Sequence, residues 1–244
     1  MPSETPHRLP RRLRGFVISG DTMTHTRALI LAGNGRTDPR WPSNPPRHLI
    51  PIGGQPLIHR TIRQLADRGI PDIRVVADPS DTDYTIPPAV HEHPRPVDRD
   101  WVQEWEPSRH LWNPDGTTLI LYGDTYFTDE LIDAMCADTG DPWNVYARFD
   151  GSTQTGKRYG EMFGWAIHSR HAAALTAAQA DVIDIRLRGE WHRALGWEVY
   201  RVALGRSPAE HWRGPHFVNW DDATDDFDTL DDWRRWAARN PDRR

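Results

Sequence analysis

Two short apolar runs, each followed directly by a glycine, constrain the fold most strongly. Residues 27–32 (RALILA) precede Gly33, and residues 117–122 (TTLILY) precede Gly123. Continuous apolar runs of this length are typical of parallel strands that are buried on both faces of a sheet. Because ligands collect at the carboxyl ends of such strands, the loops that begin at the two glycines are the places to look for a site.

The segments around these runs complete an alternating pattern of strands and helices. Residues 57–66 have the spacing of one helical face, with Pro56 at a tolerated first-turn position and Gly69 where a C-terminal cap belongs. Further strands are expected at 72–77, 143–148 and 161–168, and further helices at 128–137, 169–180, 183–204 and 230–239. The alternation predicts a mostly parallel sheet covered by helices, in a single α/β domain over residues 26–244.

The N-terminal segment is interpreted differently. Residues 1–25 are rich in arginine and proline and lack the apolar core of a secretory signal, so we expect a disordered N-terminal tail. Met23 lies just before the first strand, and translation from Met23 is therefore an alternative. Mass spectrometry of the protein made from its natural transcript would distinguish the two starts.

Composition excludes several classes of protein. Hydrophobic residues make up 37% and charged residues 27%, which is typical of a globular chain, and no apolar run approaches the length of a membrane span. The net charge of −5 argues against nucleic acid as the main ligand. The twelve histidines lack the paired spacing of a helical zinc site. We expect a soluble, cytoplasmic protein, and the oligomeric state stays open.

The single cysteine, Cys136, excludes an internal disulfide and a cysteine-based zinc site. It lies in an apolar helical pattern with Leu131, Ile132 and Met135. This setting predicts a buried, unreactive thiol and not a nucleophile.

The loop after the first strand has the character of a phosphate-binding loop. Its nucleotide-binding candidates are Leu31, Ala32, Gly33, Asn34 and Gly35, and the arginines that follow are Arg36, Arg40 and Arg47. Glycines after a buried strand let backbone N–H groups approach phosphate oxygens, and arginines from the same loop can neutralise a triphosphate. On the two glycines alone, a tight strand-to-helix turn with solvated arginines is the simpler interpretation.

Carboxylates stand at two further places. Asp124 follows the strand at 117–122, where it can hold Mg²⁺ against phosphate oxygens or simply cap the next helix. Asp226 and Asp228 belong to an acidic run before the last helix, and such runs are usually solvated. Asp231 and Asp232 in the same run are expected to be first-turn acids favoured by the helix dipole.

The longer motifs resemble one enzyme group. LAGNGR, PRHLIPIGGQPLI and the helix HRTIRQLADRGI resemble the opening signature of sugar-phosphate nucleotidyltransferases and their molybdenum-cofactor guanylyltransferase relatives. YGDTYF is similar to the family element that carries a metal aspartate, here Asp124. DFDTLDDW resembles the closing motif that supplies a second metal carboxylate, here Asp228 with Asp226 as the reserve candidate.

The resemblance implies a three-layer, Rossmann-like, GT-A-type nucleotidyltransferase fold with a mostly parallel central sheet. It also implies a nucleoside triphosphate, a phosphorylated acceptor such as a sugar phosphate, and Mg²⁺ as the cofactor. The acceptor phosphate would attack the α-phosphorus and release pyrophosphate. Catalysis would then consist of positioning and charge neutralisation, by the metal and by Arg36 or Arg40 together with Arg47.

Departures from the family pattern leave alternatives open. Arg47 stands where the family usually has lysine, which keeps the charge and changes its geometry. Arg36 and Arg40 both fit the loop arginine. A GT-A glycosyltransferase with a nucleotide-sugar donor and a catalytically inactive nucleotide-binding homologue are the alternative functions.

The substrates are less well defined by the sequence. The resemblance implies that the segment before the strand at 161–168 recognises the acceptor, with Lys157 or Arg158 as the candidate contact for its phosphate and Glu161 for a hydroxyl. A solvated loop is an equal alternative for this segment. The region from Pro79 to Pro114 is where recognition of the base is expected, but neither the base nor the acceptor can be named.

Overall fold

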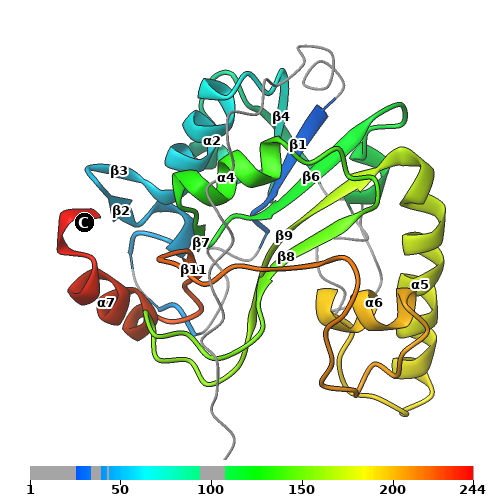
Figure 1. Cartoon of the computed structure of the whole chain (residues 1–244). Helices are drawn as coiled ribbons and strands as arrows, with labels where there is room; N and C mark the ends of the chain where they lie inside the picture. Colours follow the sequence, from blue (N-terminus) through cyan, green and yellow to red (C-terminus); the bar gives the residue numbers. More distant parts are fainter. Residues whose placement is uncertain (1–25, 34–39, 43, 94–107, 244) are drawn as a thin grey trace, which may run out of the picture.

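A seven-stranded sheet forms the centre of the protein in the computed structural model, which describes residues 26–33, 40–42, 44–93 and 108–243 (Figure 1). Its strands are β1 (Thr26–Leu31), β4 (Asp72–Val76), β5 (Val90–Glu92), β6 (Thr117–Tyr122), β8 (Asn144–Arg148), β9 (Glu161–His168) and β10 (Phe217–Asn219), in the order β10-β8-β9-β6-β1-β4-β5. Four of the neighbouring pairs are parallel, and the two pairs made by β9 are antiparallel.

The strand directions gather several chain segments at one edge of the sheet. β1 pairs in parallel with β4 and β6, so that Leu31 lies opposite both Val76 and Tyr122. β9 runs the other way, and its first residue, Glu161, lies opposite Arg148 at the end of β8. We call this the carboxyl edge of the sheet. It brings the start of β9 to the same side as the ends of β1, β6 and β8.

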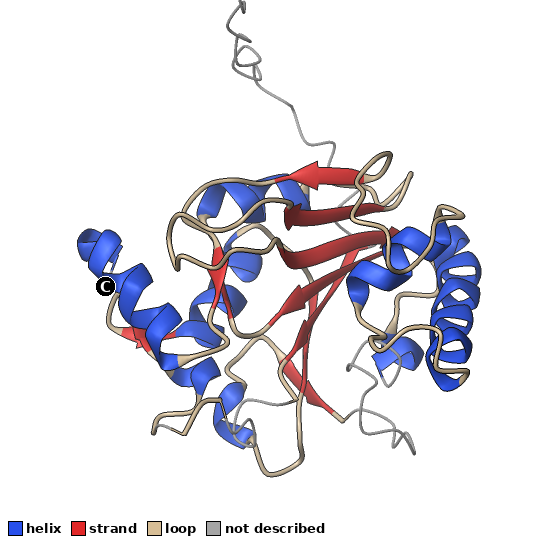
Figure 2. Cartoon of the chain, turned by 90° about the horizontal axis from the view of Figure 1, so that it is seen from below, coloured by secondary structure: helices blue, strands red, loops and turns tan. Residues whose placement is uncertain are grey.

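Helices cover both faces of the sheet (Figures 1 and 2). The helices α2 (Leu57–Asp67) and α4 (Asp129–Cys136) pack on one face, and α5 (Ser169–Leu187) and α6 (Gly196–Ala203) on the other. Leu119 and Leu121 of β6 belong to the first core and Ile120 to the second, as expected for a strand buried on both faces. The predicted three-layer α/β fold is thus confirmed. No described helix is long and apolar enough to span a membrane.

Smaller elements surround the carboxyl edge. They are the strands β2 (Pro51–Ile52), β3 (Gln55–Pro56), β7 (Thr125–Tyr126) and β11 (Asp225–Asp226), the helix α7 (Leu230–Arg239), and the 3-10 helices η1 (Arg47–Leu49), η2 (Thr82–Tyr84), η3 (Arg109–Leu111) and η4 (Pro241–Arg243). β7 pairs with β11, with Thr125 opposite Asp226. Trp236 of α7 packs against Tyr126 and Phe227, which holds this pair together.

Most predicted elements agree with the structure to within one residue, but the sequence prediction missed the sheet strands β5 and β10, and α5 continues to Leu187 instead of ending at 180. The strands at 117–122 and 161–168 and the helix at 230–239 are as expected, but the single helix predicted at 183–204 is wrong. α5 ends because Gly189 adopts a left-handed backbone conformation, with a φ of 73°. The Gly189 amide then donates to the carbonyl oxygen of Arg186, and the Glu190 amide donates to that of Ile185. A new helix then starts at Gly196, where the Glu198 carboxylate accepts a hydrogen bond from the Leu195 amide. Residues 1–25, including Met23, lie outside the described residues.

Cys136 is buried at the end of α4, as predicted, and burial raises the pKa of its thiol to about 12. Because the thiolate is the reactive form, the native protein should resist a thiol reagent at pH 8. The expected result is slow modification of native protein and rapid, stoichiometric modification in denaturant, followed by absorbance. Equal rates in both conditions would contradict this setting for the thiol.

Candidate active site

Gly123 brings the end of β6 close to the end of β1. Its amide donates to the Leu31 carbonyl oxygen at 2.8 Å, and a Cβ at this position would lie 2.9 Å from that same oxygen. Such an approach requires glycine. Asp124, the next residue, is therefore held at the carboxyl edge, beside the point where the expected nucleotide loop leaves β1.

The described part of the expected nucleotide loop is Leu31, Ala32 and Gly33, of which the first two are buried. The amide of Ala32 continues the ladder to the Val76 carbonyl. The remaining predicted loop residues, Asn34, Gly35 and Arg36, lie outside the described residues. Their predicted contacts with phosphate stay predictions.

Arg47 lies between the two carboxylates that the sequence singled out for a metal. This side chain, in η1, is 7% exposed, and its guanidinium lies 3.3 Å from Asp124 Oδ2 and 3.9 Å from Asp228 Oδ1. Arg40 reaches the same Asp228 oxygen at 3.2 Å. The structure therefore brings Arg40, Arg47, Asp124 and Asp228 into one site, although they come from three distant parts of the chain.

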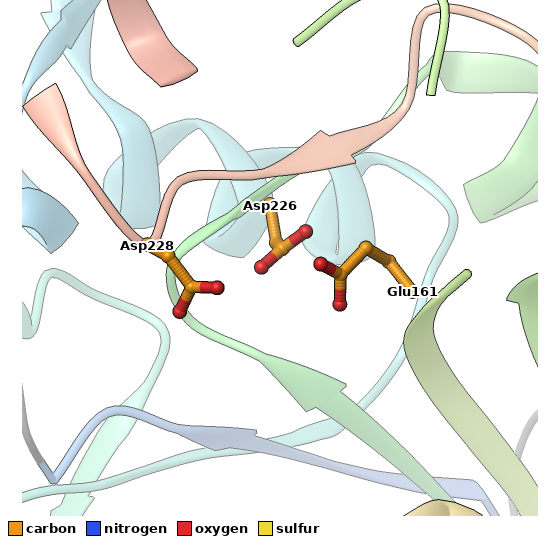
Figure 3. A group of neighbouring side chains, drawn as sticks. All are labelled: Glu161, Asp226 and Asp228. Atoms are coloured by element: carbon orange, nitrogen blue, oxygen red, sulfur yellow. The ribbon is translucent and has the colours of Figure 1, made fainter. Parts of the chain in front are cut away.

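A second group of charges adjoins Asp228. The ammonium nitrogen of Lys157 lies 2.8 Å from Asp226 Oδ2, 2.9 Å from Glu161 Oε1 and 3.2 Å from Asp228 Oδ2. Figure 3 shows the three carboxyl groups turned toward one another, and one ligand atom from each lies within 4.8 Å of the others. The Lys157 side chain is 5% exposed, so a solvated loop is the wrong interpretation for this residue, whereas Arg158 is exposed.

Burial dominates the electrostatics of this group. It raises the pKa of Glu161 to about 7, although Lys157 acts against that shift. Burial, with the charge of Glu161 next, also raises the pKa of Asp226 well above its usual range. Burial alone would lower the pKa of Lys157, but the attraction of Asp226, Glu161 and Asp228 outweighs it and raises that pKa. The Lys157 ammonium therefore offsets only part of the effect of burial on these two carboxyl groups.

Arg148 anchors the acidic segment, residues 221–232, to the sheet. This arginine was not among the residues predicted from the sequence. Its side chain is 2% exposed, lies 3.3 Å from Asp225 Oδ2 and donates to the carbonyl oxygens of Asp222 and Thr224. Asp225 is fully buried and also accepts a hydrogen bond from Thr155 at 3.1 Å. The sequence contained one indication of this role, because Arg148 is a charged residue at the end of the mostly apolar strand β8.

The last two acids of the segment have the predicted structural role. The Asp232 carboxylate accepts from the Thr229 amide, and the Thr229 hydroxyl accepts from the Asp232 amide, which caps α7. Asp231 is exposed in the first turn and pairs with Arg234. Both interactions favour the helix start, where carboxylates offset the positive end of the dipole.

Comparison with known proteins extends the result for the fold. No family model matches the sequence, and a comparison with curated proteins finds no match. A Bacillus anthracis protein designated a glucose-1-phosphate thymidylyltransferase is 14% identical, with a TM-score of 0.59 over 90% of this chain and 96% of that one. The Rv0371c homologue of Mycobacterium sp. strain JC1 is 15% identical, with a TM-score of 0.57 over 88% and 96%.

A third similar structure is the CTP:phosphocholine cytidylyltransferase of Streptococcus pneumoniae. It is 16% identical to this chain, with a TM-score of 0.51 over 86% of this chain and 97% of that one. The chain shares the fold of these proteins. At such low identity the agreement concerns architecture, so function must be argued from the site itself.

Proposed function

We propose that the protein is a nucleotidyltransferase that moves a nucleoside monophosphate from a nucleoside triphosphate to a phosphorylated acceptor and releases pyrophosphate. The main support is the contact of one buried guanidinium, that of Arg47, with both Asp124 and Asp228 at the carboxyl edge. The fold is also that of a cytidylyltransferase and of a protein designated a thymidylyltransferase. A sugar phosphate is the expected acceptor.

A divalent metal fits the residues of this site. Asp124, Asp226 and Asp228 offer oxygen ligands only, which suits Mg²⁺, and the buried Oδ1 of Asp226 has no hydrogen-bond partner among the described residues. When bound, the metal would neutralise charge on the phosphate oxygens. Glu161 offers a ligand atom within 4.8 Å of ligand atoms of Asp226 and Asp228.

The protein's own residues then position the reactants. An acceptor phosphate is already an anion, so the reaction requires no protein nucleophile or strong base. Arg40 and Arg47 would bind phosphate oxygens, and the glycine loop that begins at Gly33 would offer backbone N–H groups. Catalysis would arise from orientation and from charge stabilisation at the α-phosphorus.

The direct test is a panel of the four nucleoside triphosphates against pooled sugar phosphates and phosphocholine, with pyrophosphate as the readout and Mg²⁺ present. Pyrophosphate released only with one nucleotide and one acceptor supports the proposal. Release of a nucleoside diphosphate from a nucleotide sugar would instead indicate the glycosyltransferase. Nucleotide binding by calorimetry, without turnover on any acceptor, would indicate an inactive homologue.

Arg47 provides a test of the loop's contribution. Arg47→Ala should lower kcat by about 100–1000-fold, the usual effect of removing one preorganised hydrogen-bond donor that stabilises developing charge. Arg47→Lys should keep much of the activity, because the enzyme family that the sequence motif resembles usually has lysine there and the role is mainly charge. Steady-state pyrophosphate release measures both variants, with Arg188→Ala, an exposed arginine at the end of α5, as the control. If Arg47→Lys releases pyrophosphate more slowly than Arg47→Ala does, Arg47 does not act as a cation in the site.

A further inference from the structure

Three carboxyl groups point at a single ammonium in the site. Glu161 comes from the start of β9, whereas Asp226 and Asp228 come from β11 and the turn after it. The Lys157 nitrogen lies between 2.8 and 3.2 Å from an oxygen of each. Two separate chain segments thus direct oxygen atoms to one point, which is the arrangement that a bound cation requires.

A second observation indicates that the Lys157 ammonium does not satisfy every carboxylate oxygen of this group. Asp226 is 8% exposed, and its Oδ1 is buried with no hydrogen-bond partner among the described residues. Its carboxyl group faces the other two (Figure 3). A buried carboxylate oxygen without a partner is costly, and one more positive charge or ligand bond at this point would remove the cost.

We propose that Glu161, Asp226 and Asp228 form a divalent-cation site and that the Lys157 ammonium occupies it until the metal displaces it. The inference rests on the proposed function for its catalytic meaning, and it differs from the predicted metal site by including Glu161. Asp124 instead contacts Arg47 and is not part of the three-carboxylate group.

The dimensions suit such an exchange. Oxygens that share a Mg²⁺ at about 2.0–2.1 Å lie roughly 3–4 Å apart, so the observed limit of 4.8 Å requires only a small contraction. An ammonium holds its oxygens farther away than a metal does. Replacing one positive charge with two also strengthens the attraction to all three carboxylates.

The exchange requires only the Lys157 side chain to move. Its carbonyl oxygen accepts a hydrogen bond from the Ser152 amide at 2.9 Å, which fixes the backbone, and the side chain ends in three rotatable donors. The displaced ammonium remains near the metal because the Lys157 backbone is held beside the site. It would then be available to an anionic substrate that enters with the metal.

The test measures Mn²⁺ binding to the full, nucleotide-free protein by the electron paramagnetic resonance signal of free Mn²⁺. Lys157→Met should tighten binding by about tenfold or more, because the competing cation is removed. Glu161→Gln should weaken it at least about tenfold, since even groups that only orient ligands change metal affinity by about 10–100-fold. Glu210→Gln, a partly exposed glutamate paired with Arg206, is the matched control and should bind as wild type does.

Melting temperatures keep the inference testable if Lys157→Met is unstable. This variant should melt below the wild type without metal and be stabilised by Mn²⁺ more than the wild type is, because bound metal stabilises the folded state. Unchanged Mn²⁺ affinity in both variants, weaker binding in Lys157→Met, or an unaltered Mn²⁺ effect on its melting would each overturn the inference.

These outcomes separate the inference from the proposed function. Mn²⁺ binding is measured without nucleotide, whereas the function is measured by pyrophosphate release. The expected binding pattern without pyrophosphate on any substrate would refute the function alone. Pyrophosphate release with wild-type Mn²⁺ affinity in both variants would refute the cation exchange alone.

Discussion

Asp228→Asn is expected to reduce turnover by at least about 100-fold. The Asp228 carboxylate contacts Arg40, Arg47 and Lys157, so it joins the loop cations to the three-carboxylate group. Loss of its charge would weaken metal binding and release the two arginines from their present positions. A metal contributes several kcal/mol to charge stabilisation, and about 1.4 kcal/mol corresponds to a tenfold change in rate.

Steady-state pyrophosphate release at saturating Mg²⁺ measures this effect, with melting temperature as a check on folding. Asp124→Asn should show a loss of similar size, because Asp124 shares the Arg47 guanidinium with Asp228. Asp231→Asn is the matched control, since this aspartate is exposed on α7 and pairs with Arg234. Turnover of Asp228→Asn within about threefold of Asp231→Asn would remove Asp228 from the proposed catalytic residues.

The arrangement of charges explains why these residues are expected to act together. Arg40, Arg47 and Lys157 are each paired with carboxylates of the site. A metal would bind the carboxylate oxygens that these cations now contact, and the phosphates of the nucleotide would bind the cations. Since both exchanges replace one ion pair with another, the site can bind its ligands without leaving a buried charge unpaired.

The elements that carry the predicted site could be found from the sequence because their patterns are local. The run at 117–122 ends in Gly123-Asp124, and the helix at 230–239 starts with its own capping acids. The expectation that Asp124 and Asp228 share a site came from the resemblance of the two motifs. In the structure both carboxylates contact Arg47.

Contacts between distant side chains could not be predicted in the same way. Lys157 and Asp226 are 69 positions apart, and Arg148 and Thr224 are 76 positions apart. No periodic sequence pattern links the two residues of either pair. Their contact depends on how β8, β9 and β11 are placed relative to one another at the carboxyl edge. The prediction of a single helix at 183–204 was wrong for a local reason. The apolar spacing continues past Gly189, although this glycine ends α5.

Arg148→Met is expected to destabilise the protein by about 3–5 kcal/mol, the usual cost of breaking a buried ion pair by removing one partner. Asp225, which is fully buried, would lose its cation. The carbonyl oxygens of Asp222 and Thr224 would lose their donor as well. Because β11 begins at Asp225, the same change should displace Asp226 and reduce turnover along with stability.

Denaturant unfolding followed by circular dichroism measures this cost, with Arg234→Met as the control. Arg234 and Asp231 are exposed, and pairs of that kind contribute about 0–1 kcal/mol. The double variant Arg148→Met/Asp225→Asn should be less destabilised than the sum of its single variants, because it leaves no uncompensated charge in the core. Additive losses would mean that the two side chains do not interact. A loss in Arg148→Met no larger than in Arg234→Met would mean that Arg148 does not anchor the acidic segment.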